Sequence, residues 1–392
     1  MTPRVVAHVI ATLGVGGAEK QMVLLLRQLD RRRFRPVVAC TTRAGPLLEA
    51  LRDAGVEVTI LEKRGPVDPL LLWRLRAWMR RLDPDLVHTW MFTANTWGRL
   101  AAWLAGAPPV IAAERCVDLW KTPLHRGLDR LLARRSRRVL ANSQAVARFL
   151  VQREGIPRDL VRVIPNGLDP ADAGRLRPRD AAGVAALRRA LGLPEDALVV
   201  GDVSRLDAKN DLLSWAEVVA RLAARFPSLA AVLVGGAASR VERRYARRLE
   251  AALRERGLLG RVRLLGPRRD LENVLPALDL FLHTSVMEGF PNCIMEAMAA
   301  GLPVVATRAG GTDELVAEGE TGLLAAVGDV AALAEGATAL LADPERRRRM
   351  GEAGARRVRE QFGARRMVEA TEMIYDEILR AGGARLPRGT AT

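Results

Sequence analysis

Two glutamates, eight positions apart, carry the clearest chemistry in this sequence. Glu288 and Glu296 enclose a segment that reads Gly-Phe-Pro-Asn-Cys-Ile-Met. A pair of carboxylates suits either acid–base hydrolysis or the binding of hydroxyl groups. Free backbone amides are expected at a helix start near Asn292 and Cys293, and they favour an anionic or strongly polar ligand. With two carboxylates beside them, a hydroxyl-rich ligand fits better than bare phosphate.

The surrounding residues predict the elements that hold this pair. Residues 279–283 form a short apolar run typical of a strand buried on both faces, and residues 291–300 indicate a helix with proline near its first position. A second apolar run, 303–306, follows at once. This strand–helix–strand order is the unit of a doubly wound parallel sheet, in which ligands lie beyond the carboxyl ends of the strands. Glu288 falls at such an end.

The same segment resembles a family signature. From Glu288 through Ala297-Met-Ala-Ala-Gly-Leu-Pro303, it is similar to the Glu-x7-Glu segment of retaining, nucleotide-sugar-dependent glycosyltransferases of family four, which have the GT-B fold. The resemblance implies an α/β protein with two doubly wound parallel-sheet (Rossmann-like) domains facing a central cleft. It also implies transfer of a sugar, with retention of configuration, from a nucleoside-diphosphate sugar to a glycan or lipid-linked acceptor. Cell-surface polysaccharide or glycolipid synthesis is the implied setting.

The resemblance also implies roles for single residues. Glu296 is expected to bind the ribose hydroxyls of the donor. The first glutamate and the loop after it are expected to hold the donor sugar, namely Glu288, Gly289, Phe290, Pro291 and Asn292. In this family the leaving phosphate assists deprotonation of the acceptor, so no side-chain nucleophile is demanded. Glu288 is counted as catalytic because it grips the reacting sugar.

Sugar transfer makes negative charge grow on the leaving diphosphate, which calls for fixed positive groups or a metal. Arg205 and Lys209 follow a predicted strand, 197–203, at the sheet edge that also holds Glu288. They resemble the family's Arg-Leu…Lys segment with one residue fewer, and we predict both as catalytic and donor-binding. Asp83-Pro-Asp85 has the Asp-x-Asp pattern of metal-dependent enzymes but precedes a strand. We therefore expect no metal and no cofactor.

A glycine-rich turn, Gly14–Glu19, separates the first predicted strand, residues 5–10, from a predicted helix, 20–30. Such a turn lets the backbone approach a phosphate, although this one is not the full dinucleotide fingerprint and lacks a P-loop lysine. We predict that Gly16 and Gly17 contact the donor.

His88 closes a predicted strand at residues 85–88. Family members often carry His-x-His here, and the second histidine touches the donor sugar or acceptor; this sequence has Trp90 at that position. His88 is a candidate catalytic contact. The alternative is a packed, hydrogen-bonded histidine.

A chain of 392 residues, 49% hydrophobic, suits two domains. We predict an acceptor-side Rossmann-like domain (1–169), a linker with a short helix (170–196), a nucleotide-sugar-binding Rossmann-like domain (197–363), and a final helix and tail (364–392). In GT-B proteins the final helix crosses back to pack on the first domain.

The net charge of +16 is uneven, because residues 1–150 hold 25 basic and 12 acidic side chains. Basic helices with tryptophan can lie on an anionic membrane and bring the enzyme to a lipid-linked acceptor. Candidates are the stretch 70–82, with Trp73 and Trp78, and a leucine stripe at Leu124, Leu128, Leu131 and Leu132. The alternative is ordinary core helices with arginine-rich solvent faces.

The basic charge is also compatible with other classes of protein. Nucleic-acid binding fits the charge but lacks a reader motif, so no nucleic-acid partner is expected. A nucleotide-sugar epimerase of the same fold and a non-catalytic basic binding protein remain as alternatives. Cys40, Cys116 and Cys293 share no metal-like spacing, and no run has the length of a membrane span or the apolar core of a signal peptide. A cytoplasmic protein, with contact to the inner face of the membrane, is the expectation.

Overall fold

The computed structural model describes residues 2–65, 68–106, 108–176 and 180–381. It contains two compact units: an N-terminal unit, residues 1–167 together with the segment from Ala364 onward, and a C-terminal unit, Leu168–Gly363. Residues 177–179 of the predicted linker and 382–392 of the predicted tail lie outside the described residues.

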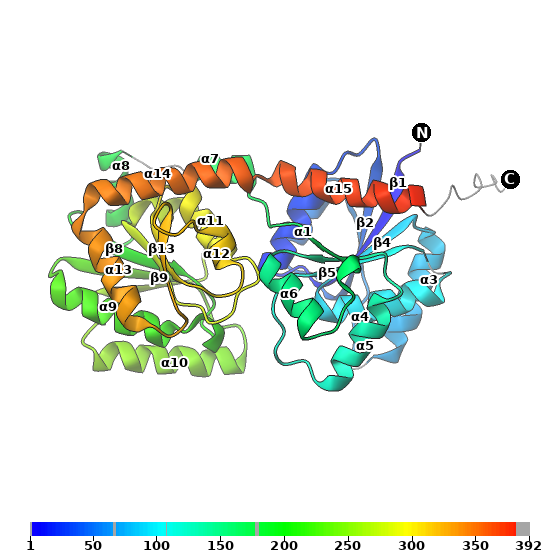
Figure 1. Cartoon of the computed structure of the whole chain (residues 1–392), viewed down its shortest axis with the longest axis horizontal. Helices are drawn as coiled ribbons and strands as arrows, with labels where there is room; N and C mark the ends of the chain where they lie inside the picture. Colours follow the sequence, from blue (N-terminus) through cyan, green and yellow to red (C-terminus); the bar gives the residue numbers. More distant parts are fainter. Residues whose placement is uncertain (1, 66–67, 107, 177–179, 382–392) are drawn as a thin grey trace. The chain divides into compact units, whose positions relative to one another are not determined.

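A seven-stranded, wholly parallel sheet forms the centre of the N-terminal unit, with strand order β3-β2-β1-β4-β5-β6-β7 (Figure 1). The strands are largely apolar because helices cover both faces. They are β1 (Arg4–Thr12), β2 (Phe34–Arg43), β3 (Glu57–Ile60), β4 (Leu86–Trp90), β5 (Val110–Glu114), β6 (Arg138–Ala141) and β7 (Val161–Val163).

Seven helices of the described chain belong to this sheet, and the last of them comes from the far end of the sequence. They are α1 (Gly17–Gln28), α2 (Leu48–Asp53), α3 (Pro69–Leu82), α4 (Met91–Leu104), α5 (Pro123–Ala133), α6 (Gln144–Gln152) and α15 (Ala364–Ala381). Met367, Tyr375 and Ile378 of α15 share one buried core with residues of β1 and α1. The final helix is thus a structural part of the first unit.

The C-terminal unit repeats the architecture around a six-stranded parallel sheet, with order β10-β9-β8-β11-β12-β13. Its strands are β8 (Leu198–Val203), β9 (Leu229–Val234), β10 (Val262–Gly266), β11 (Leu280–His283), β12 (Val304–Thr307) and β13 (Gly322–Ala325). Its α-helices are α7 (Pro170–Arg175), α8 (Ala181–Ala190), α9 (Leu212–Arg225), α10 (Arg240–Glu255), α11 (Asn292–Ala299), α12 (Thr312–Leu315), α13 (Val330–Ala342) and α14 (Pro344–Gln361). The predicted fold class, two parallel-sheet Rossmann-like domains, is confirmed.

The strand order of this second sheet decides where a ligand can lie. The chain passes from β8 outward to β9 and β10, then returns to place β11 on the other side of β8. At such a reversal the loops after the two neighbouring strands diverge and leave space beyond their carboxyl ends. The loops after β8 and β11 hold Arg205, Lys209 and Glu288.

Local details differ from the sequence predictions. Helix α11 begins at Asn292 with Pro291 as its N-cap, one position earlier than the first-turn role predicted for the proline. The leucine stripe of α5, given two alternatives above, is divided between core and surface, since Leu132 is buried but Leu124 and Leu131 are 81% and 51% exposed. The spacing of the leucines predicted a helix here but did not predict which face of the helix packs on the sheet.

Candidate functional site

A polar cluster lies beyond the carboxyl ends of β8 and β11. The two strands pair at Leu280–Val200 and Phe281–Gly201, which brings the last residue of β11, His283, beside Asp202 of β8. His283 Nδ1 lies 2.9 Å from Asp202 Oδ1, and His283 Nε2 lies 3.2 Å from Glu288 Oε1. Glu288 was predicted from the sequence, but Asp202 and His283 were not, because in the sequence they look like the ends of two apolar strands.

The inner part of this cluster is buried. Asp202 and His283 are each 1% exposed, whereas the Glu288 side chain keeps a fifth of its surface accessible (20%). Burial opposes protonation of His283, but the charge and hydrogen bond of Asp202 and those of Glu288 outweigh it and raise the pKa of His283 to about 10. At neutral pH an imidazolium therefore donates to both carboxylates.

The loop after Glu288 is fixed by close backbone contacts. Gly310 has a φ of +58°, and a Cβ there would lie 1.8 Å from the carbonyl oxygen of Glu288. Gly311 N donates to Gly289 O at 3.1 Å. Only glycine fits at position 310, both for its left-handed conformation and for this contact.

The predicted donor-binding residues of this loop differ in exposure. Phe290 is 4% exposed and packs on Phe362, with ring centroids 5.3 Å apart, so its side chain anchors the loop instead of lining a surface. Gly289 and Pro291 are also buried, while Asn292 and Glu296 are partly exposed at the start and along α11. Among the predicted donor-binding residues of this segment, Glu288, Asn292 and Glu296 are the ones with partly exposed side chains.

The loop that carries Arg205 and Lys209 is tied to the end of β11. Lys209 O accepts from Val286 N at 2.7 Å and from Ser285 Oγ at 3.0 Å. The Arg205 guanidinium is 3.5 Å from an Asp207 carboxylate oxygen and 3.7 Å from one of Glu242, yet it remains 69% exposed. Both cationic side chains are exposed at the same sheet edge as Glu288. The structure thus gathers the main sequence-predicted residues of this unit.

Gly16 and Gly17 lie in the N-terminal unit, at the start of α1 after β1. Gly16 is the extended N-cap residue, with φ −105°, and a Cβ there would lie 2.2 Å from Glu19 Oε2. The clashing atom is the far end of the flexible Glu19 side chain, which can move aside, so neither this contact nor the backbone conformation requires glycine at position 16. Contact of either glycine with a donor stays a prediction.

His88 is packed inside the N-terminal unit. It is 1% exposed, its Nδ1 lies 2.7 Å from Tyr375 Oη, and its ring stacks on Trp90 at 4.5 Å between centroids. Trp90 Nε1 in turn donates to His8 Nδ1 at 3.1 Å. The prediction of His88 as a catalytic contact is corrected accordingly: the side chain is a packed, hydrogen-bonded histidine, because β4 places it under the α15 helix.

Because His8 and His88 are buried, we expect the unfolding free energy of the protein to fall in acid. Burial lowers the pKa of His8 to about 3 and that of His88 well below its usual range, so both are neutral in the folded protein. Their folded pKa values lie below the unfolded ones. Their contribution to stability is therefore present above pH 6.5 and lost as the pH falls, at about 1.4 kcal/mol per pH unit for each group. In the His88→Gln variant one group fewer takes up a proton on unfolding. Its unfolding free energy should therefore fall less steeply between pH 6 and 4.5, by about 1.4 kcal/mol per pH unit.

Tyr375→Phe supplies the matched control for this titration, measured by denaturant unfolding. It removes the hydrogen-bond partner of His88 but keeps both histidines, so it should lower stability with the pH slope unchanged. An equal slope in wild type and His88→Gln would show that His88 is not the titrating group.

A second buried cluster in the same unit is built on charges. Lys121 Nζ lies 2.9 Å from Asp129 Oδ2, 2.8 Å from Glu154 Oε1 and 3.8 Å from Glu114 Oε1. Burial first, then the neighbouring carboxylates, raise the pKa of Glu114 to about 7 against the attraction of Lys121, and burial also raises that of Glu154. Arg99 pairs with Asp129 as well. The side chain of Lys121 is 1% exposed, which makes this a structural network.

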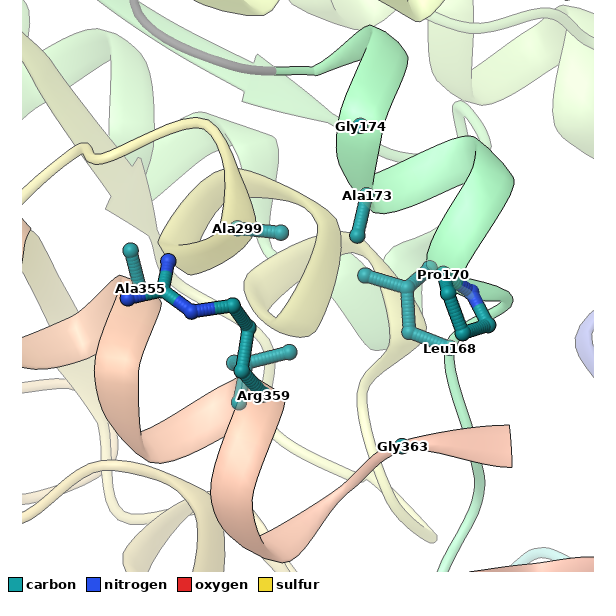
Figure 2. A pocket seen from close by; sticks show the side chains of 9 residues that line it. Leu168, Pro170, Ala173, Gly174, Ala299, Ala355, Arg359 and Gly363 are labelled. Carbon is teal, nitrogen blue, oxygen red and sulfur yellow. The ribbon is translucent and has the colours of Figure 1, made fainter. Parts of the chain in front are cut away.

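A separate hollow of about 680 Å³ lies in the C-terminal unit between α7, α11 and α14 (Figure 2). It is lined by Leu168, Pro170, Ala173, Gly174, Ala299, Ala355, Val358, Arg359 and Gly363. Arg359 is the one charged side chain among these described residues, and the Glu288 cluster does not contribute to the lining. The hollow is therefore separate from the candidate functional site around Glu288.

Two negative findings concern the described ranges alone. There, no three histidine, cysteine, aspartate or glutamate side chains gather as they would around a metal ion. Among the helices of the same ranges, none is both long and apolar enough to cross a membrane. Asp85, from the rejected Asp-x-Asp pattern, accepts from Val5 N at 2.7 Å at the amino ends of β1 and β4, opposite the edge where ligands bind.

Two Rossmann-like units, one with paired glutamates and cations at its strand ends, define a glycosyltransferase of the GT-B class. Comparisons agree: residues 15–172 match the family model described as Glycosyltransferase Family 4, and residues 184–357 match that of Glycosyl transferases group 1. The chain belongs to the family-four glycosyltransferases.

Relatives of known name align with much of the chain. D-inositol 3-phosphate glycosyltransferase of Corynebacterium jeikeium is 30% identical over 88% of this chain and 79% of its own. 2-deoxystreptamine glucosyltransferase of Streptomyces kanamyceticus is 28% identical over 76% of this chain and 79% of its own. The N-acetyl-alpha-D-glucosaminyl L-malate synthase of Bacillus anthracis is 41% identical, but over 31% of this chain and 32% of its own.

A solved structure shares the fold. Anabaena HepE in complex with UDP-glucose superposes with a TM-score of 0.84 at 25% identity, covering 95% of this chain and 99% of that one. A glycosyltransferase from Rickettsia africae reaches the same TM-score at 18% identity, over 97% and 100% of the two chains.

Proposed function

We propose that this glycosyltransferase moves a sugar from a nucleoside-diphosphate sugar to a glycan or lipid-linked acceptor, with retention of configuration and without a metal. One observation carries the proposal: the Val286–Lys209 backbone bond ties the loop with the exposed cations to the loop that leads to Glu288. A ligand with sugar hydroxyls at one end and a diphosphate at the other matches that order. Anabaena HepE, one of the solved structures with this fold, was crystallised in complex with UDP-glucose.

Each group has a role in the proposed reaction. Glu288 accepts hydrogen bonds from sugar hydroxyls and Glu296 from those of the ribose. The bond from the anomeric carbon to the phosphate oxygen breaks, and that oxygen keeps the electron pair. The acceptor oxygen bonds to the same face of the carbon and passes its proton to the leaving phosphate. Arg205 and Lys209 stabilise the charge that develops there, and this is the reason why no metal is required.

The test is a product analysis. We would incubate the protein with a panel of UDP-, GDP-, ADP- and dTDP-sugars and with soluble and lipid-linked acceptors, with and without EDTA. A glycosylated product, with the donor's anomeric configuration by NMR and an unchanged yield in EDTA, is expected. An epimerised donor without transfer would replace the proposal by the epimerase alternative, and donor binding without any product by a non-catalytic role.

The N-terminal unit supports a further element of the proposal, contact with an anionic membrane that carries the acceptor. Around the start of α5, Leu119, Trp120 and Leu124 are 59%, 53% and 81% exposed. The same helix carries Arg126 and Arg130 and is capped by Arg134, all part of the basic excess of this unit. Exposed apolar side chains beside arginines suit the interface of an anionic bilayer.

Vesicle sedimentation checks the membrane contact. Trp120→Ser/Leu124→Ser should cut binding to vesicles with 30% phosphatidylglycerol by about tenfold, and 0.5 M NaCl should weaken the wild type. Val241→Ser is the matched control, since Val241 is 78% exposed on α10 of the other unit. Equal binding of all variants would remove this part of the proposal.

A further inference from the structure

His283 is a buried ionisable group that none of the roles above uses. Its two ring nitrogens contact carboxylates from two different elements, Asp202 on β8 and Glu288 on the loop after β11. By comparison, the side chain of His88 has a hydrogen-bond contact with Tyr375, and burial keeps its pKa well below the usual range, so it is neutral. His283 instead bridges the buried floor of the site and its partly exposed glutamate.

The lower end of this bridge is rigid. Asp202 Oδ1 accepts from Val203 N at 2.8 Å, and Asp202 Oδ2 accepts from Ser204 Oγ at 2.6 Å. Because both of its oxygens accept hydrogen bonds, the Asp202 carboxylate is held in one orientation. Its contact with Nδ1 in turn fixes the plane of the His283 ring. The Phe281 ring lies stacked beside it at 6.2 Å between centroids. A rigid donor therefore points at Glu288 Oε1.

The local charges give the bridge a second role. Cys293, on α11, lies in the fields of Glu288, Asp202 and Glu296, which add to burial in raising the pKa of its thiol. The neighbourhood thus holds three carboxylates, and a donor diphosphate would bring further negative charge to the same edge. A buried ion group of this kind costs desolvation energy, so an apolar core would be more stable. Unlike the fully buried Lys121 network, this ion group ends at Glu288, whose side chain is 20% exposed and can meet a ligand.

We propose that His283 is a positioning residue: anchored on Asp202, it fixes Glu288 in the rotamer that accepts hydrogen bonds from the donor sugar and offsets one of the carboxylate charges beside the diphosphate. The inference rests on the proposed function. It predicts that His283 affects binding of the sugar part of the donor and not of its nucleotide part. Asp202, Ser204 and His283 act only through Glu288 and touch no substrate.

Two amide variants separate the two hydrogen bonds of the ring. The Asn amide nitrogen lies near the position of Nδ1 and the Gln amide nitrogen near that of Nε2. His283→Asn keeps the contact with Asp202 and loses that with Glu288; His283→Gln does the reverse. His283→Asn should bind UDP-glucose at least tenfold more weakly than wild type in calorimetry, with UDP affinity within about twofold. His283→Gln should recover most of the loss.

The outcomes are distinct. Combined with Glu288→Gln, His283→Asn should add little further loss, because both changes remove one interaction. Equal loss of UDP and UDP-glucose affinity in His283→Asn, or additive effects in the double variant, would overturn the positioning role. If the wild type bound no nucleotide or nucleotide sugar of the panel above, the proposed function itself would fail, which the wild-type titration alone reveals.

Discussion

Replacement of Arg205 and Lys209 together by alanine is expected to lower turnover by about 100- to 1,000-fold. These side chains are proposed to meet the charge that grows on the leaving diphosphate, which is larger in the transition state than in the bound donor. Their loss should therefore reduce kcat more than donor affinity. Both are exposed and make few stabilising contacts, so the fold should survive. Initial rates at saturating donor and thermal unfolding measure the two properties.

Glu296→Ala provides the contrast within the same site. It is proposed to hold ribose hydroxyls, which change little during the reaction, so the donor KM should rise while kcat stays within a few-fold. Arg221→Ala is the surface control, because Arg221 is half exposed on α9 and pairs only with Glu217 among the ion pairs of the described chain. Unchanged kinetics in Arg205→Ala/Lys209→Ala would remove the diphosphate role from these residues.

The largest loss of stability is expected from Lys121→Met. The substitution conserves volume but leaves Glu114, Asp129 and Glu154 buried without their shared cation. Removal of one partner from a buried ion network costs about 3–5 kcal/mol of unfolding free energy. Burial already raises the folded-state pKa values of Glu114 and Glu154, and loss of the cation should raise them further, so the loss of unfolding free energy should grow between pH 5 and 8 and shrink in acid. Denaturant unfolding at both pH values measures it.

A second substitution tests whether charge is the cause. Glu154→Gln in the Lys121→Met background removes one uncompensated carboxylate and should restore about 1–2 kcal/mol, whereas in the wild-type background it should destabilise. If both backgrounds lost stability alike, lost packing against Phe92, whose ring centroid lies 5.0 Å from Lys121 Nζ, would explain the effect instead.

Sequence reasoning located the elements better than the contacts between them. The β11–α11–β12 unit was predicted because short apolar runs and helix-stop residues are local signals. The Asp202–His283–Glu288 bridge could not be predicted in this way, because it depends on the pairing of β8 with β11, about 80 residues apart in the chain. The clue was a polar residue at the end of two apolar strands.

His88 shows the opposite error. The family's His-x-His pattern at this strand end suggested contact with a substrate, and a packed, hydrogen-bonded histidine was the alternative. Its actual partner, Tyr375, comes from α15, almost three hundred residues later. No local pattern could show that the last helix covers this strand. Likewise, the exposure of Leu124 depends on how α5 rests on the unit and not on its period.

The place of α15 has a consequence for synthesis of the chain. Residues that complete the core around β1 and α1, such as Met367 and Tyr375, are made after the whole of the C-terminal unit. At 5–20 residues per second, translation of that intervening unit takes roughly 10–40 s. The first unit to leave the ribosome is thus the last to complete its core, and until then the surface that α15 covers stays open to chaperones. The continuous second unit can finish folding first.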